Sequence, residues 1–323
     1  MTQTTKHNPD SKFVSIVVPF HNESENVDIF YTTLVESLQR VKDIQFEIIC
    51  IDDGSTDDTL KKLIAHASHD ERIHIIELSR NFGKESALTA GIDHAQGRAV
   101  IPIDADLQDP PDVVPALIEK WLQGAEVVLA HRMDRSSDTL AKRKTAEWFY
   151  RFHNKVSQVH IPENVGDFRL IDRIVVEALK QLPEKQRFMK GLFAWVGFKT
   201  ESIEYVRLPR EASNTKFSGW KLWNFALEGI TSFSTAPLKV WTYIGAIGAL
   251  VTFAYASFII LDTIISGVDV PGYASLLVVI LFFGSLQLMS VGLLGEYIGR
   301  IYLETKQRPT YIVRQYHGKE SGS

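Results

Sequence analysis

Residues 46–57 read FEIICIDDGSTD, an apolar run that passes without a break into a polar, acidic loop. Apolar runs of this length, rich in β-branched side chains, predict buried strands. We therefore expect a strand over Phe46–Ile51, and the same pattern recurs before and after it. The further strands expected are Phe13–Val18, Ile73–Leu78, Ala99–Ile103 and Glu126–Ala130.

Helical stretches separate the expected strands, for example Ser24–Val41 and Asp57–Ala67. Strands that alternate with helices of this length indicate βαβ units and a mostly parallel sheet. In such sheets ligands bind beyond the carboxyl ends of the strands. The predicted fold class is α/β and Rossmann-like, and its loops after the strands are where a site is expected.

Four consecutive strand ends carry polar or acidic residues. The loops are Pro19–Glu23, Asp52–Asp57, Ser79–Lys84 and Asp104–Pro110. Because the carboxyl ends of parallel strands meet at one edge of the sheet, these loops are expected to converge. Their convergence predicts one polar site and carries more weight than any single motif.

The fourth loop begins with two carboxylates, Asp104 and Asp106, on either side of Ala105. A turn after Ile103 can bring both to one cation, and hard oxygen ligands suit Mg²⁺ or Mn²⁺. Such an ion would neutralise a diphosphate leaving group. Acid pairs at this spacing also occur by chance in surface loops, but the position after an apolar strand favours a metal site.

The second loop offers two readings for Asp52 and Asp53. Gly54 and the following hydroxyl residues are typical of a turn with a helix cap. Two adjacent acids at a strand end can also accept hydrogen bonds from a ribose or a base. Arg80 and Lys84 of the third loop are either solvated charges or part of the same nucleotide site.

Composition excludes several classes of function. The formal net charge of −4 gives no support for nucleic-acid binding, which usually requires a basic excess. The histidines are scattered and the chain has one cysteine, so a zinc site is not expected. Residues 1–12 are polar, are expected to be disordered, and do not resemble a signal peptide. A catalytic region that follows them is expected to stay in the cytoplasm.

The C-terminal third has a different character. Val240–Leu261 and Ala274–Leu294 contain no charged residue, and each reaches the ~20 residues that cross a bilayer. Basic residues flank the pair but are missing from the loop between them, which places both ends in the cytoplasm. Buried core helices are the alternative. The expected boundaries are 13–210 catalytic, 211–236 interfacial amphipathic helices, 237–299 two transmembrane helices, and 300–323 a cytoplasmic tail.

Taken together, these segments resemble the family-2 glycosyltransferases of the GT-A fold. Within that family the chain is similar to the polyisoprenyl-phosphate glycosyltransferases, which include bactoprenol glucosyltransferases and dolichol-phosphate mannose synthases. The resemblance covers almost the whole chain. In chain order, the motifs that carry it are Val18–Glu23, Asp52–Ser55, Arg80–Lys84, Asp104–Pro111, Gly166–Leu170, Lys216–Ser218 and Gly292–Arg300.

The resemblance implies roles for individual residues. The base and ribose would be held by Pro19, Asn22, Glu23, Asp52 and Asp53. The metal and diphosphate would be bound by Asp104, Asp106 and Gln108, with Ala105 lying between the two acids. Asp167 would lie near the sugar and the acceptor with Arg169 beside it, so the catalytic set is Asp106, Asp167 and Arg169. An alternative for Asp167 is a loop acid paired to Arg169.

Several basic residues lie in the sequence between the fourth loop and the expected transmembrane spans, and they require an anionic partner. They are Arg132, Lys142, Arg143, Arg187, Arg210 and Lys216. An acceptor phosphate carries about −1.5 to −2 charges at neutral pH and needs such a cluster. Anionic lipid headgroups are the alternative partner. Arg210 and Lys216 also match an Arg…Lys-aromatic-Ser element of the family.

The predicted function is an inverting, metal-dependent transfer of a hexose, glucose favoured, from a nucleotide-sugar to a polyisoprenyl phosphate. UDP as nucleotide and undecaprenyl phosphate as acceptor follow from the resemblance alone. The chain would be an integral protein of the cytoplasmic membrane, and homo-oligomerisation is expected because two spans rarely form a stable unit. The alternatives are a processive polysaccharide synthase of the same superfamily and a non-catalytic membrane-bound nucleotide-sugar binder.

Overall fold

The computed structural model describes residues 12–132, 165–185, 187, 189–205, 236–266 and 272–318. These residues fall into two compact units. The first unit contains the sheet, its helices and the segment from Arg308 onward, and the second contains a pair of long helices. The expected disordered segment 1–12, except Lys12, and the expected interfacial helices 211–236, except Ala236, lie outside the described residues.

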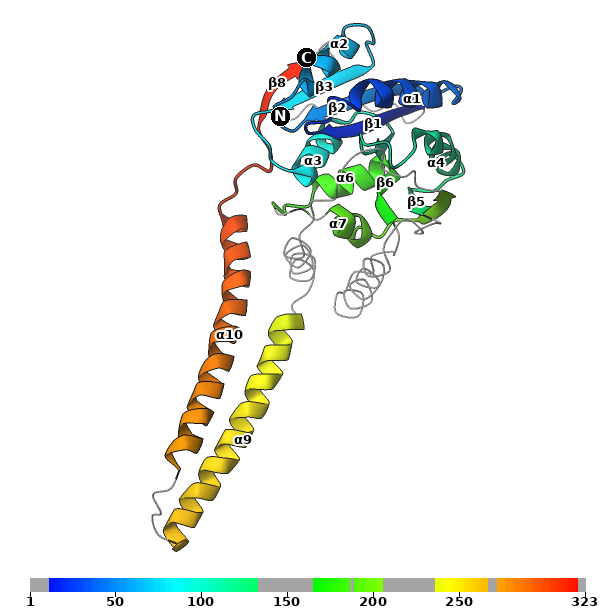
Figure 1. The fold of residues 1–323 in the computed structure, drawn as a ribbon. Coiled ribbons are helices and arrows are strands. Elements are labelled where there is room, and N and C mark those ends of the chain that lie inside the picture. The colour runs from blue at the N-terminus through cyan, green and yellow to red at the C-terminus, as the bar shows by residue number, and fades with distance from the viewer. Residues whose placement is uncertain are drawn as a thin grey trace, which may run out of the picture. The chain divides into compact units, whose positions relative to one another are not determined.

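Among the described residues, the first unit has an eight-stranded sheet in the order β7-β5-β6-β4-β1-β2-β3-β8 (Figure 1). β6 and β8 run antiparallel to their neighbours, and the other strands share one direction. The mostly parallel α/β sheet expected from the sequence is therefore confirmed. The strands are β1 Phe13–Phe20, β2 Gln45–Asp52, β3 Ile73–Leu78, β4 Ala99–Pro102, β5 Val127–Arg132, β6 Val165–Asp172, β7 Thr200–Tyr205 and β8 Val313–His317.

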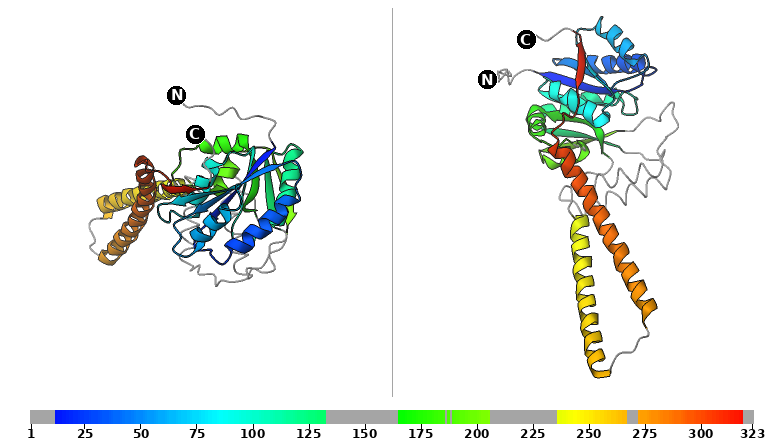
Figure 2. Two further views of the ribbon diagram at one scale, coloured as in Figure 1. Left: turned by 90° about the horizontal axis from the view of Figure 1, so that it is seen from above. Right: turned by 90° about the vertical axis from the view of Figure 1, so that its left-hand side faces the viewer.

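Helices cover both faces of this sheet (Figures 1 and 2). Val14, Ile16 and Val18 of β1 belong to a core cluster that includes residues of α1, α2 and α4. Val17 points to the opposite face, where α3 packs so closely that a Cβ on Gly91 would lie 2.2 Å from it. The helices of this unit are α1 Val27–Gln39, α2 Thr59–Ala67, α3 Lys84–His94, η1 Pro111–Val113, α4 Val114–Leu122, α6 Arg173–Lys180 and α7 Met189–Trp195.

The C-terminal segment differs from the expected tail over 300–323. The long helix α10 continues to Thr305, and residues Val313–His317 add β8 to the sheet edge beside β3 (Figure 1). Tyr311 also donates a hydrogen bond to Asp93 at the end of α3. The sequence shows no long apolar run here because an edge strand needs only one buried face.

The second unit is a helical hairpin of α9 Ala236–Ser266 and α10 Tyr273–Thr305. The two helices contact each other, and a Cβ on Gly248 would lie 3.5 Å from the ring of Phe283. A pair of helices is thus confirmed where two spans were expected. Among the described residues, no helix has both the length and the apolar character needed to cross a membrane.

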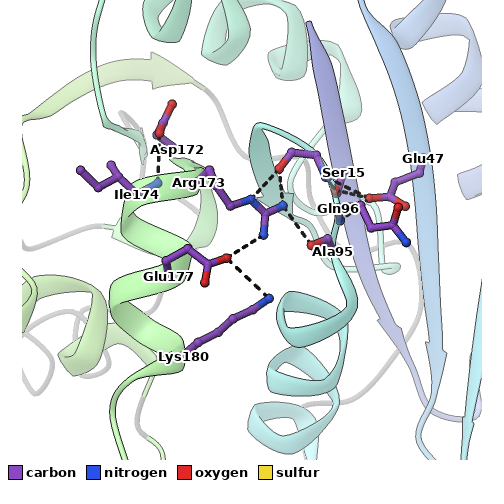
Figure 3. Close-up of polar contacts among 10 residues, drawn as sticks. Ser15, Glu47, Ala95, Gln96, Asp172, Arg173, Ile174, Glu177 and Lys180 are labelled. Atoms are coloured by element: carbon purple, nitrogen blue, oxygen red, sulfur yellow. Dashed lines mark hydrogen bonds and ion pairs between the residues drawn. The ribbon is translucent and has the colours of Figure 1, made fainter. Parts of the chain in front are cut away.

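The buried carboxylate of Glu47 links β1 and β2 to the turn between α3 and β4 (Figure 3). Glu47 of β2 accepts hydrogen bonds from the Ser15 hydroxyl at 2.5 Å and from the backbone N–H groups of Gln96 at 2.7 Å and Gly97 at 3.2 Å. Arg173 of α6 donates from the other side to the carbonyls of Ala95 and Gly97. The turn between α3 and β4 is therefore fixed by two oppositely charged groups.

Replacing this carboxylate should destabilise the protein. Glu47→Ala leaves buried N–H donors without an acceptor, and we expect a loss of about 3 kcal/mol in the free energy of unfolding. The urea midpoint of the purified chain measures it. Glu36→Ala, at an exposed position of α1, is the control and should stay within about 0.5 kcal/mol. Equal midpoints for the two variants would show that Glu47 is not a structural anchor.

Candidate functional site

The register of the parallel strands brings the predicted loops together. Phe20 of β1 lies opposite Asp52 of β2, and Val17 lies opposite Pro102 of β4. β1 and β2 therefore end at the same level, and β4 ends level with Val17, so the acidic loop begins beside the last residues of β1. β6 runs antiparallel to β4, so its first residues, with Asp167, lie at this same edge. The predicted convergence is confirmed, and β6 adds a segment that periodicity alone did not identify as a strand.

The first and second loops are joined by hydrogen bonds from Asn22. Its side-chain oxygen accepts from the Thr56 N–H at 2.8 Å, and its own N–H donates to the Ser55 hydroxyl at 3.1 Å. Asn22 has a φ of 55°, a conformation that asparagine adopts more readily than most residues. Beside it, Glu23 donates its N–H to the Thr59 hydroxyl. Both predicted residues thus shape the loops, and Pro19 lies within β1.

His21 links three loops and was not among the predicted site residues. Its Nε2 lies 2.8 Å from the Asn81 side-chain nitrogen, and its Nδ1 lies 2.9 Å from the Asp53 carbonyl oxygen. An amide nitrogen only donates and a carbonyl only accepts, so His21 accepts at Nε2 and donates at Nδ1. The imidazole is thus a spacer between the ends of β1, β2 and β3. Its place between Phe20 and Asn22 was the available sequence signal.

The two adjacent acids of the second loop have different surroundings. Asp53 is buried and accepts from the N–H groups of Phe82 at 2.7 Å and Gly83 at 2.9 Å, which fixes the third loop. Asp52 accepts from the Ser55 N–H at 3.2 Å, while its other oxygen is buried without a hydrogen-bond partner. Burial raises the pKa of Asp52. Asp52 therefore has the open acceptor that a ligand hydroxyl or N–H could fill.

A glycine lets the second and third loops touch. Gly54 has a φ of 63°, and a Cβ there would lie 2.5 Å from backbone atoms of Arg80 and Asn81. Beyond this contact, the Arg80 guanidinium lies over the Phe82 ring, 4.1 Å from its centre, and donates to the Asn81 carbonyl. Arg80 is thus held at the loop surface with its charge exposed.

The acidic fourth loop is a tight turn. Leu107 has a φ of 57°, and the N–H of Gln108 donates to Asp106 at 3.2 Å. Ala105 is buried, which orients its neighbours Asp104 and Asp106 outward from the core. The loop ends on Asp109, whose buried carboxylate accepts a short hydrogen bond from the hydroxyl of Tyr205. Strand β7, which was not predicted, therefore anchors the loop.

One ammonium connects the fourth loop to β6. The Nζ of Lys84 lies 2.7 and 2.8 Å from the two oxygens of Asp104 and 2.9 Å from one oxygen of Asp167. The other oxygen of Asp167 is buried without a hydrogen-bond partner. The ion-pair partner of Asp167 is thus Lys84, and not Arg169 as the alternative reading proposed. Lys84 was predicted to lie on the nucleotide side, whereas here it contacts Asp104, a predicted metal ligand.

The charges of this cluster shift one another's pKa values. Burial would raise the pKa of Asp167, but Lys84, Lys190 and Arg169 outweigh it and lower that pKa to about 2. Burial would lower the pKa of Lys84, but Asp104 and Asp167 outweigh it and raise that pKa. For Asp104, burial prevails over Lys84 and raises the pKa. Asp167 is therefore a permanent carboxylate at neutral pH.

Arg169 is a buried cation that interacts electrostatically with Asp167. It is 5% exposed, donates to the Gly166 carbonyl at 2.7 Å, and lies 4.2 Å from the centre of the Phe193 ring. Burial lowers the pKa of Arg169 to about 10. Glu85, next to Lys84, accepts from the Met189 N–H at 3.1 Å, and burial followed by Asp167 raises the pKa of Glu85 to about 7. α7 is thereby tied to the site.

The predicted basic cluster is only partly described. Arg187 donates to the carbonyls of Leu182 and Glu184 in its own loop. Arg132 is the last residue of β5. Lys142, Arg143, Arg210 and Lys216 lie outside the described residues. A gathering of these groups around a phosphate therefore stays a prediction.

Histidine, cysteine, aspartate and glutamate side chains do not gather in threes in a metal-binding arrangement anywhere in the described part of the chain. The predicted set is different in kind, because it joins two carboxylates with the amide of Gln108. Asp104 and Asp106 both lie in the turn after β4, with side chains that are partly exposed. Hard oxygen donors from few protein residues are what Mg²⁺ and Mn²⁺ accept. The donor chemistry therefore fits the predicted metal.

Two family profiles and two close relatives all identify the chain as similar to glycosyl transferases. Residues 15–180 match the profile of glycosyl transferase family 2, and residues 236–301 match that of the GtrB C-terminal hairpin. A prophage bactoprenol glucosyl transferase homolog of Escherichia coli K12 is 58% identical over 94% of this chain and 98% of its own. The bactoprenol glucosyl transferase of Shigella phage SfII is 57% identical over 94% and 98%.

Among solved structures, a mannosyltransferase of Pyrobaculum calidifontis in complex with GDP-Man and Mn²⁺ aligns with 92% of this chain and 84% of its own. The sequence identity is 18% and the TM-score is 0.48.

The contact made at Gly54 can be tested through nucleotide binding. Gly54→Ala forces the backbone at Arg80 and Asn81 to move, and we expect at least about tenfold weaker binding of UDP. Isothermal titration calorimetry measures it. Gly124→Ala is the matched control, because Gly124 also has a positive φ of 99° but open space around a Cβ. An equal loss in both variants would mean that backbone strain, and not the loop contact, is responsible.

Proposed function

Because the chain belongs to glycosyl transferase family 2, we propose that it transfers a hexose from a nucleotide-sugar to a polyisoprenyl phosphate. Glucose, UDP and undecaprenyl phosphate are the favoured sugar, nucleotide and acceptor. The observation that carries the proposal is the cluster at one sheet edge, where the ends of β1, β2, β3 and β4 meet Asp167 of β6. The names of relatives that align over nearly their whole length support the bactoprenol acceptor and the glucosyl group.

The donor is expected to bind across the first three loops. Asp52 supplies the unpartnered acceptor oxygen for a ribose hydroxyl or a base N–H. Asp53 and His21 hold the third loop in place, and Arg80 presents its charge at the surface. The family roles given to Pro19, Asn22 and Glu23 stay predictions.

Asp104 and Asp106, with Gln108, would hold the divalent ion of the donor complex. When bound, Mg²⁺ or Mn²⁺ would neutralise the charge that accumulates on the departing diphosphate. Lys84 adds a positive charge on the same side. Metal dependence is part of the proposal and rests on this donor chemistry.

The acceptor needs little proton transfer. A phosphate oxygen is already ionised at neutral pH, so a general base contributes less than it would for a sugar hydroxyl. Asp167, with its pKa near 2, is a poor proton acceptor and is suited to orienting the sugar or stabilising positive charge on it. A single in-line displacement at the anomeric carbon would invert its configuration. Catalysis would then come from positioning and charge stabilisation.

The acceptor phosphate is assigned to basic residues of the cluster predicted from the sequence. The set proposed is Arg132, Arg143, Arg187, Arg210 and Lys216. A phosphate needs several such donors, because each charge-assisted hydrogen bond compensates part of its charge. Arg187 is a weaker candidate for a phosphate ligand than expected, since two of its N–H groups already donate to nearby carbonyls.

We further propose that the α9–α10 hairpin lies in the cytoplasmic membrane, with the catalytic unit and both termini in the cytoplasm. In the full sequence Val240–Leu261 and Ala274–Leu294 carry no charge. Large apolar side chains of the hairpin are exposed, among them Phe253 at 74%, Ile264 at 75% and Ile265 at 82%. Apolar surface of this extent marks a membrane or partner contact. Association of several copies through the hairpin stays a prediction.

One assay distinguishes the proposed function from the two alternative functions. A processive synthase would extend a polysaccharide, and a non-catalytic binder would hold the donor without turnover. Incubating the purified chain with radiolabelled UDP-glucose, with and without undecaprenyl phosphate, should give a lipid-linked sugar only when the lipid is present. Lipid-independent polymer would favour the synthase, and no turnover would favour the binder.

The metal assignment predicts the effect of one acid. Asp106→Ala should lower the rate of transfer at least about a hundredfold while the chain still folds, because the leaving diphosphate loses its charge partner. Radiolabelled product measures the rate. Asp112→Ala, an exposed acid two residues beyond the same loop, should keep the wild-type rate. Near-normal transfer by the Asp106 variant would refute the assignment.

The membrane proposal predicts how the chain behaves on extraction. Alkaline carbonate should leave the wild-type chain in the membrane pellet. Leu250→Arg places a charge within an apolar run, at a cost of about 3 kcal/mol at the bilayer centre, and should increase the released fraction. Leu122→Arg, at an exposed position of α4, is the control and should behave as wild type. Release of the wild-type chain by carbonate would contradict membrane insertion.

A further inference from the structure

The contacts of Lys84 saturate its side chain. An ammonium has three N–H donors, and three carboxylate oxygens lie within 2.9 Å of this one. Two belong to Asp104 and one to Asp167, so a single positive charge bridges an acid of the loop after β4 and an acid of β6. Without it, the negative charges of Asp104 and Asp167 would repel each other across the site.

The same contacts conflict with metal binding. Both oxygens of Asp104 already accept from Lys84, so a divalent ion on this residue would have to share an oxygen with the ammonium. An ion there would also lie a few ångströms from the ammonium, where like charges repel strongly. The Lys84–Asp104 pair and a cation on Asp104 are therefore alternatives.

We propose that Lys84 is a placeholder cation that holds Asp104 and Asp167 while the donor is absent and releases Asp104 when the metal enters with the nucleotide diphosphate. This inference rests on the proposed donor site and adds an order of events to it. The diphosphate is the component that makes the exchange favourable, because its negative charge compensates both cations. A bare divalent ion is repelled by the ammonium and brings no negative charge to compensate that repulsion.

The side chain has the freedom that the exchange needs. Lys84 is the first residue of α3, its side chain is 46% exposed, and it ends in a flexible four-carbon stem. Once Asp104 is released, the ammonium keeps its contact with Asp167 and has donors available for a diphosphate oxygen. Lys84 is thus a positioning residue before the donor binds and a diphosphate ligand afterwards.

Binding of Mn²⁺ tests the proposal without measuring catalysis. The probe is free Mn²⁺ followed by electron paramagnetic resonance, titrated into the purified full chain with and without UDP. For the wild type, we expect weak binding of Mn²⁺ alone and much tighter binding with UDP. Lys84→Met removes the charge, so Mn²⁺ alone should bind at least about tenfold tighter and the gain from UDP should shrink.

Further variants isolate the cause. Lys84→Gln is neutral but still donates hydrogen bonds, so it should reproduce the tighter Mn²⁺ binding even where Lys84→Met folds poorly. Lys84→Arg keeps the charge and should retain the weak binding of Mn²⁺ alone. Lys62→Met, which removes a half-exposed lysine of α2 paired to Asp28 of α1, should change nothing.

The proposal is overturned if neither neutral variant binds Mn²⁺ more tightly than the wild type, or if Lys84→Arg gains as much as they do. It is also overturned if the wild type binds Mn²⁺ equally well with and without UDP. An error in the proposed lipid acceptor would be distinguishable from an error in the role of Lys84. It would give no transfer to undecaprenyl phosphate, while the Mn²⁺ binding results would be as expected.

Discussion

The ion cluster of Lys84, Asp104 and Asp167 depends on one topological constraint, the direction of β6. Because β6 runs antiparallel to β4, its first residues lie at the edge where the parallel strands end. A parallel β6 would place Asp167 at the opposite edge, away from the acidic loop. The buried core of β1, β2 and β4 then holds these groups at one edge of the sheet, so a single ammonium can bridge acids 63 positions apart in the chain.

The surrounding loops are held by contacts that are specific to this arrangement. His21 separates the first three strand ends, Asp53 fixes the third loop, and Gly54 allows the backbones to touch. Asp109 and Tyr205 anchor the acidic loop from the other side. Most polar atoms at this edge therefore serve other protein groups. The unpartnered oxygens of Asp52 and Asp167 stand out as positions for ligand atoms.

The hairpin and the catalytic unit illustrate two ways of using apolar residues. In the sheet, alternate residues of β1 pack against helices on opposite faces and are almost completely buried. In α9 and α10, large apolar side chains remain exposed. The first arrangement stabilises a globular fold by itself, whereas the second requires another apolar environment, which the proposal assigns to lipid.

Apolar runs and the polar residues that follow them determined the first five strands, the α/β class, the long helices and the edge where the site lies. These features are local, because each strand and its loop are adjacent in the chain. Tertiary structure alone decided that β6, β7 and β8 complete the sheet and that Asp52 and Asp53 differ. It also decided that Lys84 pairs with Asp104 and Asp167. Such pairings depend on strand direction and on distances between remote segments, which residue order does not specify.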